Sequence, residues 1–167
     1  QEMSRGLGDV YKRQVILLAP FWVSYSAIVL MADGIPKILK SDISNDFKVS
    51  AKQIDDAISE KTKMIIINSP NNPSGSIYNK KELYEIASVV KKYPNVFVLS
   101  DEIYEHINYG TEHVSFASIE GMYDRTITVN GIAKAFAMTG WRIGYLGAPI
   151  WIATVSYTHL RAHETSP

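Results

Sequence analysis

The chain has 167 residues, with 17 basic and 17 acidic side chains, 46% apolar residues and no cysteine. This length fits one ordinary domain, which buries about two-thirds of the surface of its unfolded chain. Zero net charge with a normal apolar content argues against intrinsic disorder and against the basic stripe of a nucleic-acid binder. Without cysteine there is no disulfide and no thiolate ligand. We expect no metal site and a cytoplasmic protein.

The first apolar stretch, Val15–Ala32, holds no charged residue and follows Lys12 and Arg13, as in a signal peptide or membrane anchor. However, Pro20 interrupts the stretch, and polar residues 24–26 lie in its middle. A helix that crossed a bilayer would have to satisfy those polar groups internally. We therefore expect a buried strand followed by a helix, and no membrane segment.

Short apolar runs rich in β-branched residues alternate with longer helical patterns along the chain. The predicted strands are Val15–Leu18, Lys37–Lys40, Met64–Asn68, Val96–Ser100, Thr126–Asn130 and Ile143–Gly147. The predicted helices are Ser24–Ala32, Ala51–Ser59 and Lys80–Lys92. Ser50 is a suitable N-cap for the second helix, and Asn79 with Glu82 forms a capping-box pattern for the third. This alternation predicts an α/β fold with a mostly parallel sheet and helices on both of its faces.

Unusual polar and aromatic residues follow the predicted strands, where open parallel sheets bind their ligands. Trp22 follows the first strand, and residues 71–75 (Asn-Asn-Pro-Ser-Gly) follow the third. Asp101 follows the fourth strand, with Tyr104 three residues later, and Lys134 follows the fifth. Each alone has a plainer interpretation: a common turn sequence, a helix cap or a structural lysine. Together they predict a ligand site at this edge of the sheet.

With Arg142, which precedes the last predicted strand, this set of side chains suits an aromatic, phosphorylated aldehyde. A lysine condenses with the aldehyde, a carboxylate pairs with a protonated ring nitrogen, and an arginine binds a phosphate through two hydrogen bonds. A tryptophan stacks on the ring face. Pyridoxal 5'-phosphate has all of these features. For Arg142 alone, a surface ion pair is the plainer interpretation.

Four segments resemble class I/II pyridoxal-phosphate-dependent aminotransferases, in particular bacterial aspartate aminotransferases. They are Ala19–Tyr25 (APFWVSY), Ser69–Gly75 (SPNNPSG), Ser100–Tyr104 (SDEIY) and Asn130–Tyr145 (NGIAKAFAMTGWRIGY). Their order and spacing match that family from about Val15 to Ala153. The resemblance implies the large domain of the aspartate aminotransferase fold, in which the strand after Arg142 runs antiparallel to its neighbours and brings that arginine to the same edge of the sheet.

The resemblance also implies a role for each matching residue. Lys134 would hold the cofactor as a Schiff base and move the substrate proton, and Asp101 would keep the ring nitrogen protonated. These two residues and Tyr104 form the implied catalytic set. Among the implied cofactor-binding residues, Trp22 would stack on the ring, and Asn72 and Tyr104 would donate to its phenolic oxygen. Asp101 would pair with the ring nitrogen, and Lys134 would bind the aldehyde carbon. Arg142 would bind the phosphate.

The implied activity is transamination between an L-amino acid, with aspartate the expected donor, and a 2-oxo acid, in a homodimer that binds neither nucleic acid nor membrane. Within the same fold, an aromatic or alanine aminotransferase and a carbon–sulfur β-lyase stay open. A non-catalytic alternative is the aminotransferase-like sensor domain of a transcription regulator. A generic nucleotide-binding domain is disfavoured, because no Gly-x-Gly-x-x-Gly or phosphate-loop motif follows a predicted strand.

We expect residues 15–154 to be a partial large domain, flanked by residues 1–14 and 155–167 that do not resemble the family. The 167 residues hold neither the Gly/Ser/Thr-rich turn that precedes this region in the family nor the small domain that binds the substrate carboxylate. Residues 155–167 also show no clear helical period. We expect these 167 residues to be inactive alone, because substrate positioning supplies much of the reduction of the barrier.

Overall fold

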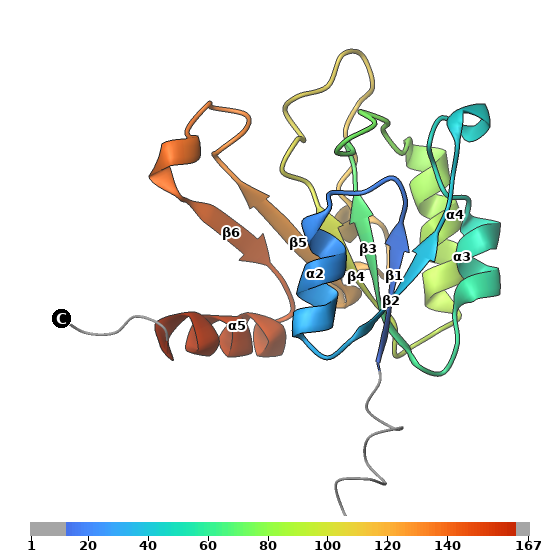
Figure 1. Ribbon diagram of the computed structural model, residues 1–167, viewed down its shortest axis with the longest axis horizontal. Coiled ribbons are helices and arrows are strands. Elements are labelled where there is room, and N and C mark those ends of the chain that lie inside the picture. Colours follow the sequence, from blue (N-terminus) through green and yellow to red (C-terminus); the bar gives the residue numbers. More distant parts are fainter. Residues whose placement is uncertain (1–12, 163–167) are drawn as a thin grey trace, which may run out of the picture.

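A six-stranded sheet with helices on both faces forms the centre of the computed structural model, which describes residues 13–162 and side chains through residue 158 (Figure 1). The strands are β1 Gln14–Leu18, β2 Ile35–Leu39, β3 Thr62–Asn68, β4 Phe97–Asp101, β5 Thr126–Gly131 and β6 Gly144–Gly147. The helices are α2 Ser24–Met31, α3 Ala51–Ala57, α4 Lys80–Lys91 and α5 Ile150–Ala162. The predicted α/β class is confirmed.

The strands lie in the order β2-β1-β3-β4-β5-β6, and their directions determine at which edge of the sheet the site lies. All neighbouring strands pair in parallel except β5 and β6. The parallel strands therefore bring their carboxyl ends to one edge of the sheet. In the antiparallel pair, Gly131 at the end of β5 lies opposite Gly144 at the start of β6. The chain thus returns to the same edge after β5, as the family resemblance implied.

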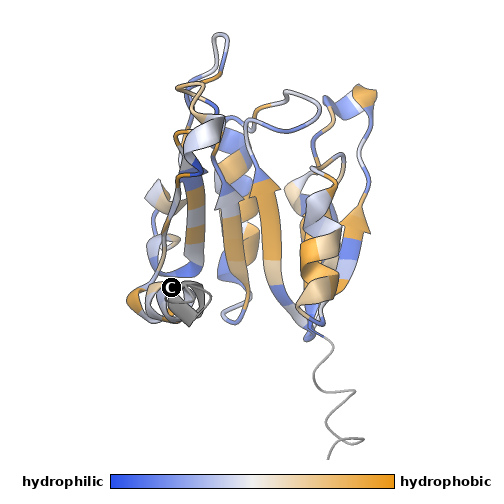
Figure 2. Cartoon of the chain, turned by 60° about the vertical axis from the view of Figure 1, so that its left-hand side comes forward, coloured by the Kyte–Doolittle hydropathy of each residue, from blue (hydrophilic) through white to orange (hydrophobic). Residues whose placement is uncertain are grey.

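Two apolar clusters cover the opposite faces of the sheet. On one face, α3 and α4 bury Ile54 and Ile86 against Ile65 of β3. On the other face, α2 buries Tyr25 against Ile66, the next residue of β3. Because successive side chains of a strand point to opposite faces, a strand covered on both sides must be apolar throughout. Figure 2 shows this as continuous hydrophobic colouring along the central strands.

Local signals in the sequence explain where these elements begin. Ser50 caps α3 and Asn79 caps α4, and in each case the side chain three positions later completes a capping box. Both predictions are confirmed. β2 begins at Ile35 rather than at the predicted Lys37, so it includes Pro36. An edge strand tolerates this proline, because it pairs with a neighbour on one side only.

The final helix corrects the expectation from the sequence. α5 extends from Ile150 to Ala162, although residues 155–167 show no clear helical period. No glycine or proline between Pro149 and Pro167 interrupts it. The apolar residues among positions 150–158, namely 150–153, 155 and 157, fall on all sides of the helix, so the sequence has no apolar stripe to reveal it, and none of the side chains at 150–158 is buried. Trp151 nevertheless joins α5 to the sheet through an edge contact with Phe97, with ring centroids 5.6 Å apart.

The uncharged stretch Val15–Ala32 folds into β1, a loop and α2, which confirms the predicted strand followed by a helix. β1 lies between β2 and β3, so both of its edges are paired. Within residues 13–162, no helix combines the length and the apolar content that a membrane crossing requires.

Gly131 allows the close approach of β5 and β6. A Cβ atom at this position would lie 2.9 Å from the carbonyl oxygen of Ile143 and 3.2 Å from the Cα of Gly144. We expect Gly131→Ala to lower the free energy of unfolding by about 1–3 kcal/mol, as overpacking does, measured by urea denaturation. Gly147→Ala is the matched control, since nothing lies within 4 Å of a Cβ there. Equal losses in the two variants would contradict this explanation.

Candidate active site

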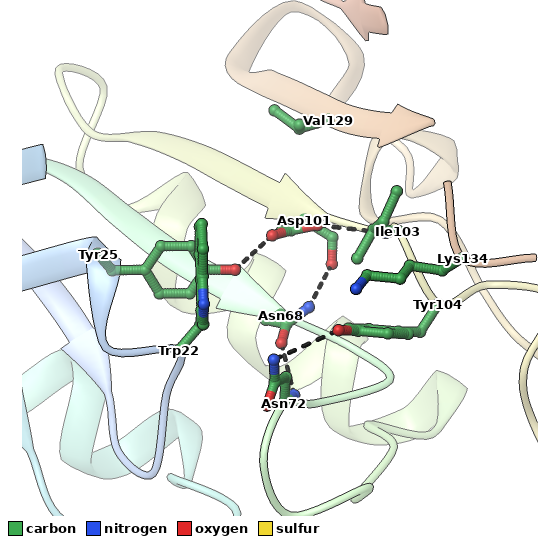
Figure 3. Close-up of a pocket in the computed structure, with 9 residues that line it drawn as sticks. All are labelled: Trp22, Tyr25, Asn68, Asn72, Asp101, Ile103, Tyr104, Val129 and Lys134. Carbon is green, nitrogen blue, oxygen red and sulfur yellow. Dashed lines mark hydrogen bonds between the residues drawn. The ribbon is translucent and has the colours of Figure 1, made fainter. Parts of the chain in front are cut away.

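A cavity of about 230 Å³ lies at the carboxyl edge of the parallel strands (Figure 3). Residues from the ends of β3, β4 and β5, from helix α2 and from the loops after β1, β3, β4 and β5 line it: Trp22, Tyr25, Asn68, Asn72, Asp101, Ile103, Tyr104, Val129 and Lys134. Five of the six side chains predicted to bind a cofactor are among them, and Arg142 is not. The loops after β1, β3, β4 and β5 therefore converge as the strand-end argument predicted.

The loop after β3 is joined to the loop that carries Trp22. Asn71 Nδ2 donates a hydrogen bond to the carbonyl oxygen of Pro20 at 3.1 Å. The Gly75 N–H donates to the carbonyl oxygen of Asn71 at 2.9 Å, with Gly75 at a φ of 74°. Glycine adopts this left-handed conformation without strain. The Asn-Asn-Pro-Ser-Gly sequence is thus a turn and, through Asn72, also part of the cavity wall.

One wall of the cavity is a chain of polar contacts from β3 to the turn after β4. Asn72 Nδ2 donates to the hydroxyl of Tyr104 at 3.3 Å, and the Asn72 N–H donates to Asn68 Oδ1 at 2.7 Å. Asn68 is buried at the end of β3, and its Nδ2 donates to the carbonyl oxygen of Asp101 at 3.0 Å. Asn68 was not predicted as a site residue. The sequence feature that could have identified it is an amide side chain directly after the apolar run 64–67.

Two groups orient the Asp101 carboxylate. Oδ1 accepts the Ile103 N–H at 3.2 Å, and Oδ2 accepts a short hydrogen bond from the hydroxyl of Tyr25. Tyr25 is buried on α2, and its ring makes a T-shaped contact with Trp22 at 5.6 Å between centroids. Burial and the negative charge of Asp101 raise the pKa of Tyr25 far above its ordinary value. The phenol therefore stays protonated and donates to the carboxylate. Tyr25 was not predicted as a site residue.

Lys134 enters the cavity from the loop between β5 and β6, and its amine points toward the space beside Asp101 and Tyr104 (Figure 3). The loop turns directly after it, since the Ala137 N–H donates to the carbonyl oxygen of Lys134 at 3.2 Å. Among the described residues, no carboxylate lies within 4.0 Å of this amine and no acceptor within hydrogen-bond distance. The arrangement leaves an amine available to react in the cavity.

Arg142 lies at the predicted edge of the sheet but does not line the cavity. It follows the turn Thr139–Trp141 with a φ of 55°, and its side chain is exposed. Its Nη1 donates to the carbonyl oxygen of Thr139 at 3.3 Å. The position agrees with the prediction because β6 begins just after Arg142 at the edge where β5 ends. The side chain, however, is turned to its own loop.

Behind Asp101, the buried Glu102 fixes the segment that follows β4. Its Oε1 accepts hydrogen bonds from the Ser100 hydroxyl at 2.8 Å, the Ser115 hydroxyl at 3.0 Å and the Phe116 N–H at 3.2 Å. Its Oε2 lies 3.1 Å from His113 Nε2. Burial raises the pKa of Glu102, but the hydrogen bonds from His113 and the serines, with the charge of His113, outweigh it and leave the pKa below the ordinary 4.5.

This lowered pKa predicts a loss of stability in acid. A carboxyl whose pKa is lower in the folded than in the unfolded state stabilises the fold fully above its unfolded pKa, and the contribution is lost as pH falls through the folded value. We expect Glu102→Gln to lower the free energy of unfolding at neutral pH by about 1–3 kcal/mol and to flatten its decline in acid. Urea denaturation at several pH values checks this, with the exposed Glu60→Gln as control. An acid decline as steep as in the wild type would contradict it.

The same region holds three side chains of the kinds that bind metals. Ligand atoms of Glu102, Glu105 and His113 all lie within 4.8 Å of one another. Both oxygens of Glu102 are already taken up by hydrogen bonds, and Glu105 Oε1 accepts from Asn130 at 2.7 Å. We therefore interpret the cluster as a hydrogen-bond network that supports the site.

Comparison with known proteins gives the family of the chain. Residues 10–157 match the family described as Aminotransferase class I and II. A bifunctional aspartate aminotransferase and glutamate/aspartate-prephenate aminotransferase of Petunia hybrida is 50% identical over 137 residues, which are 81% of this chain and 29% of that protein. An aspartate/prephenate aminotransferase of Nitrosomonas europaea is 42% identical over 157 residues, which are 92% of this chain and 39% of that protein.

A solved structure is similar as well. The crystal structure of the aspartate aminotransferase from Rhizobium meliloti has a TM-score of 0.89 and 39% sequence identity with this chain. The similarity covers 93% of this chain and 39% of that one. The chain thus spans between 29% and 39% of the length of these relatives. With a family match over residues 10–157 and the same fold, the chain belongs to the class I and II aminotransferases.

Proposed function

We propose that this chain supplies the cofactor-binding part of an enzyme that transfers an amino group between an L-amino acid and a 2-oxo acid, using pyridoxal phosphate. The observation that carries the proposal is the convergence of Lys134, Asp101 and Trp22 on one cavity, with Asn72 and Tyr104 on its wall. Membership of the aminotransferase family supports the reaction class.

The donors and surfaces of the cavity fit this cofactor. When bound, pyridoxal phosphate draws electrons from the substrate into its protonated ring. Asp101 offers the ring nitrogen a carboxylate oriented by Ile103 and Tyr25. The amide of Asn72 and the hydroxyl of Tyr104 supply two adjacent polar groups for the phenolic oxygen. Trp22 is 45% exposed, so a face of its indole is available for stacking.

Two residues of the chain would handle the protons of the reaction, and two tyrosines would hold the groups in place. Lys134 would hold the cofactor through Nζ until the substrate amine takes its place on the cofactor, and the freed, neutral amine would then accept the α-proton of the substrate and return it. Asp101 holds the proton on the ring nitrogen by accepting its hydrogen bond. Tyr104 holds the phenolic oxygen from one side, and Tyr25 prevents Asp101 from rotating away.

The phosphate of the cofactor is proposed to bind Arg142. The guanidinium lies at the edge of the sheet where the other site residues lie. Within the described part of the chain it forms no ion pair with a carboxylate, so it is available to an external anion. A planar guanidinium binds phosphate with two parallel hydrogen bonds.

Aspartate is the proposed amino donor, because the three relatives named above all carry aspartate in their names. The prephenate in two of those names makes a larger 2-oxo acid with a non-aromatic six-membered ring the next candidate substrate. Several parts of the proposal rest on the resemblance to the family: a homodimer, a cytoplasmic location, the division of the chain at residues 14 and 154, and no turnover by these 167 residues alone.

Titration of the chain with pyridoxal phosphate, followed by borohydride reduction and peptide mapping, tests the proposal. We expect a saturable absorbance band and a reduced label on Lys134. Pyridoxamine phosphate is the control, since it has no aldehyde and cannot label a lysine. Label spread evenly over surface lysines without a saturable band would contradict the proposal.

A further inference from the structure

A buried asparagine joins two of the loops that form the cavity, although it does not line the cavity itself. Asn130 is 7% exposed near the end of β5. Its Nδ2 donates to Glu105 Oε1 at 2.7 Å, and its Oδ1 accepts the Gly131 N–H at 2.7 Å. Glu105 directly follows Tyr104, and Asn130 lies four residues before Lys134. One side chain therefore connects the turn that carries Tyr104 with the loop that carries Lys134.

The partner of Asn130 projects from a fixed turn. The Glu105 N–H donates to the carbonyl oxygen of Glu102 at 2.9 Å, and the Glu105 carbonyl oxygen accepts from Asn108 Nδ2 at 2.8 Å. Glu102 is itself held by the buried network described above. The exposed His106 also places its Nε2 3.3 Å from the same oxygen, Glu105 Oε1. The carboxylate is thus a stable acceptor, and a charged acceptor makes a stronger hydrogen bond than a neutral one.

The other end of the contact is fixed by the sheet. Asn130 lies opposite Tyr145 in the β5–β6 pair. In the described part of the chain, the bond from Asn130 to Glu105 is the one hydrogen bond between residues 130–143 and residues 102–109. The rings of His106 and Phe136 also meet, 5.9 Å apart, but Phe136 is 59% exposed and water can replace this contact. Together with the backbone hydrogen bond from the Glu102 N–H to the carbonyl oxygen of Val129 at 2.9 Å, the buried side-chain hydrogen bond sets how the two loops lie against each other.

We propose that Asn130 and Glu105 are positioning residues whose hydrogen bond holds the Lys134 loop against the Tyr104 turn. The bond thereby fixes where the lysine amine meets the aldehyde of the cofactor. This inference rests on the proposed function, and it assigns to the pair no contact with cofactor or substrate.

Exchanging donor and acceptor tests the pair. Asn130→Asp removes the amide donor and places a second carboxylate against Glu105. Glu105→Gln removes the charge but keeps an oxygen that can accept from Asn130. The double variant again sets one amide donor against one carboxylate acceptor, in reversed order. Asn95→Asp is the matched control, because it makes the same exchange at an exposed residue in the turn before β4, away from both loops.

The measurement is the rate at which the lysine-linked absorbance band forms after mixing each variant with pyridoxal phosphate, with thermal unfolding as a check on folding. We expect Asn130→Asp to slow the band about tenfold or more, which equals about 1.4 kcal/mol. Glu105→Gln and Asn95→Asp are expected to stay within about threefold of the wild type, as is the double variant. A rate that recovers in the double variant, while the single variant unfolds at the wild-type temperature, shows that the rate follows the hydrogen bond and not the stability of the fold.

Two results would overturn the inference. One is an Asn130→Asp rate equal to that of the wild type, and the other is a double variant as slow as the single one. If Asn130→Asp does not fold, Glu105→Ala replaces it, because this half-buried position loses only the acceptor, and a wild-type rate there also overturns the inference. Absence of the band in the wild type overturns the proposed function together with this inference, whereas equal rates in all variants overturn the inference alone.

Discussion

Replacing Lys134 with alanine is expected to abolish the covalent attachment of pyridoxal phosphate, with borohydride labelling reduced to background. Lys134 supplies the only lysine amine among the described residues that line the cavity, so no neighbour can take over the condensation. Stacking on Trp22 and the contact with Asp101 do not depend on this amine. We therefore expect weak, non-covalent binding to persist, visible as quenching of tryptophan fluorescence without the lysine-linked absorbance band.

Lys37→Ala is the matched control for this experiment. The Lys37 amine is also part-buried, but it donates to the carbonyl oxygen of Ala57 at 2.7 Å and takes no part in the cavity. This variant is expected to be labelled at Lys134 at the wild-type rate. A normal absorbance band in Lys134→Ala would require a different lysine as the anchor and would contradict the assignment.

Replacing Asp101 with asparagine is expected to weaken the binding of pyridoxal phosphate by about 10- to 150-fold. This corresponds to the 1.5–3 kcal/mol or so that a hydrogen bond to a charged group contributes. An amide oxygen can still accept the Ile103 N–H, so the turn after β4 is expected to keep its shape. Because the charge is lost, the ring nitrogen is no longer held protonated. Equilibrium titration by absorbance measures the dissociation constant, and an unchanged value would contradict the role of Asp101.

Tyr25→Phe separates the orientation of Asp101 from its charge. The variant keeps the ring against Trp22 and removes only the hydroxyl that donates to Asp101. We expect a loss of affinity of about three- to tenfold, smaller than that of Asp101→Asn. Tyr78→Phe is the control, since its buried hydroxyl bonds the backbone of Val49 outside the cavity. It is expected to cost stability without affecting the affinity for the cofactor.

The sequence predicted residues that line the cavity, such as Asp101 and Lys134, better than the residues that orient them, such as Tyr25 and Asn68. Asp101 and Lys134 follow strands whose apolar runs are plain in the sequence, so the rule for parallel sheets places them at one edge. Tyr25 was missed because its partner lies 76 residues away, and no local pattern shows which helix faces which strand end. Asn68 was missed for the same reason: the β3–β4 register that sets it beside Asp101 exists only in the folded sheet.

The remaining differences have physical causes of their own. Arg142 adopts a φ of 55°, a conformation that a sequence pattern indicates for glycine or asparagine but not for arginine. Its side-chain direction therefore could not be predicted, although its edge of the sheet could. α5 was missed because a helix is detected in a sequence by apolar residues that recur on one side, whereas those at 150–153, 155 and 157 of α5 fall on all sides.

The pairing of Gly131 with Gly144 has a consequence for how such an enzyme can evolve. Lys134, the proposed nucleophile, lies in a loop whose two ends are paired side by side in the sheet. An insertion or deletion within this loop alters the reach of the amine but shifts no strand. Selection can therefore adjust the position of the proposed nucleophile by loop length alone, independently of the strands that carry the groups proposed to bind the ring.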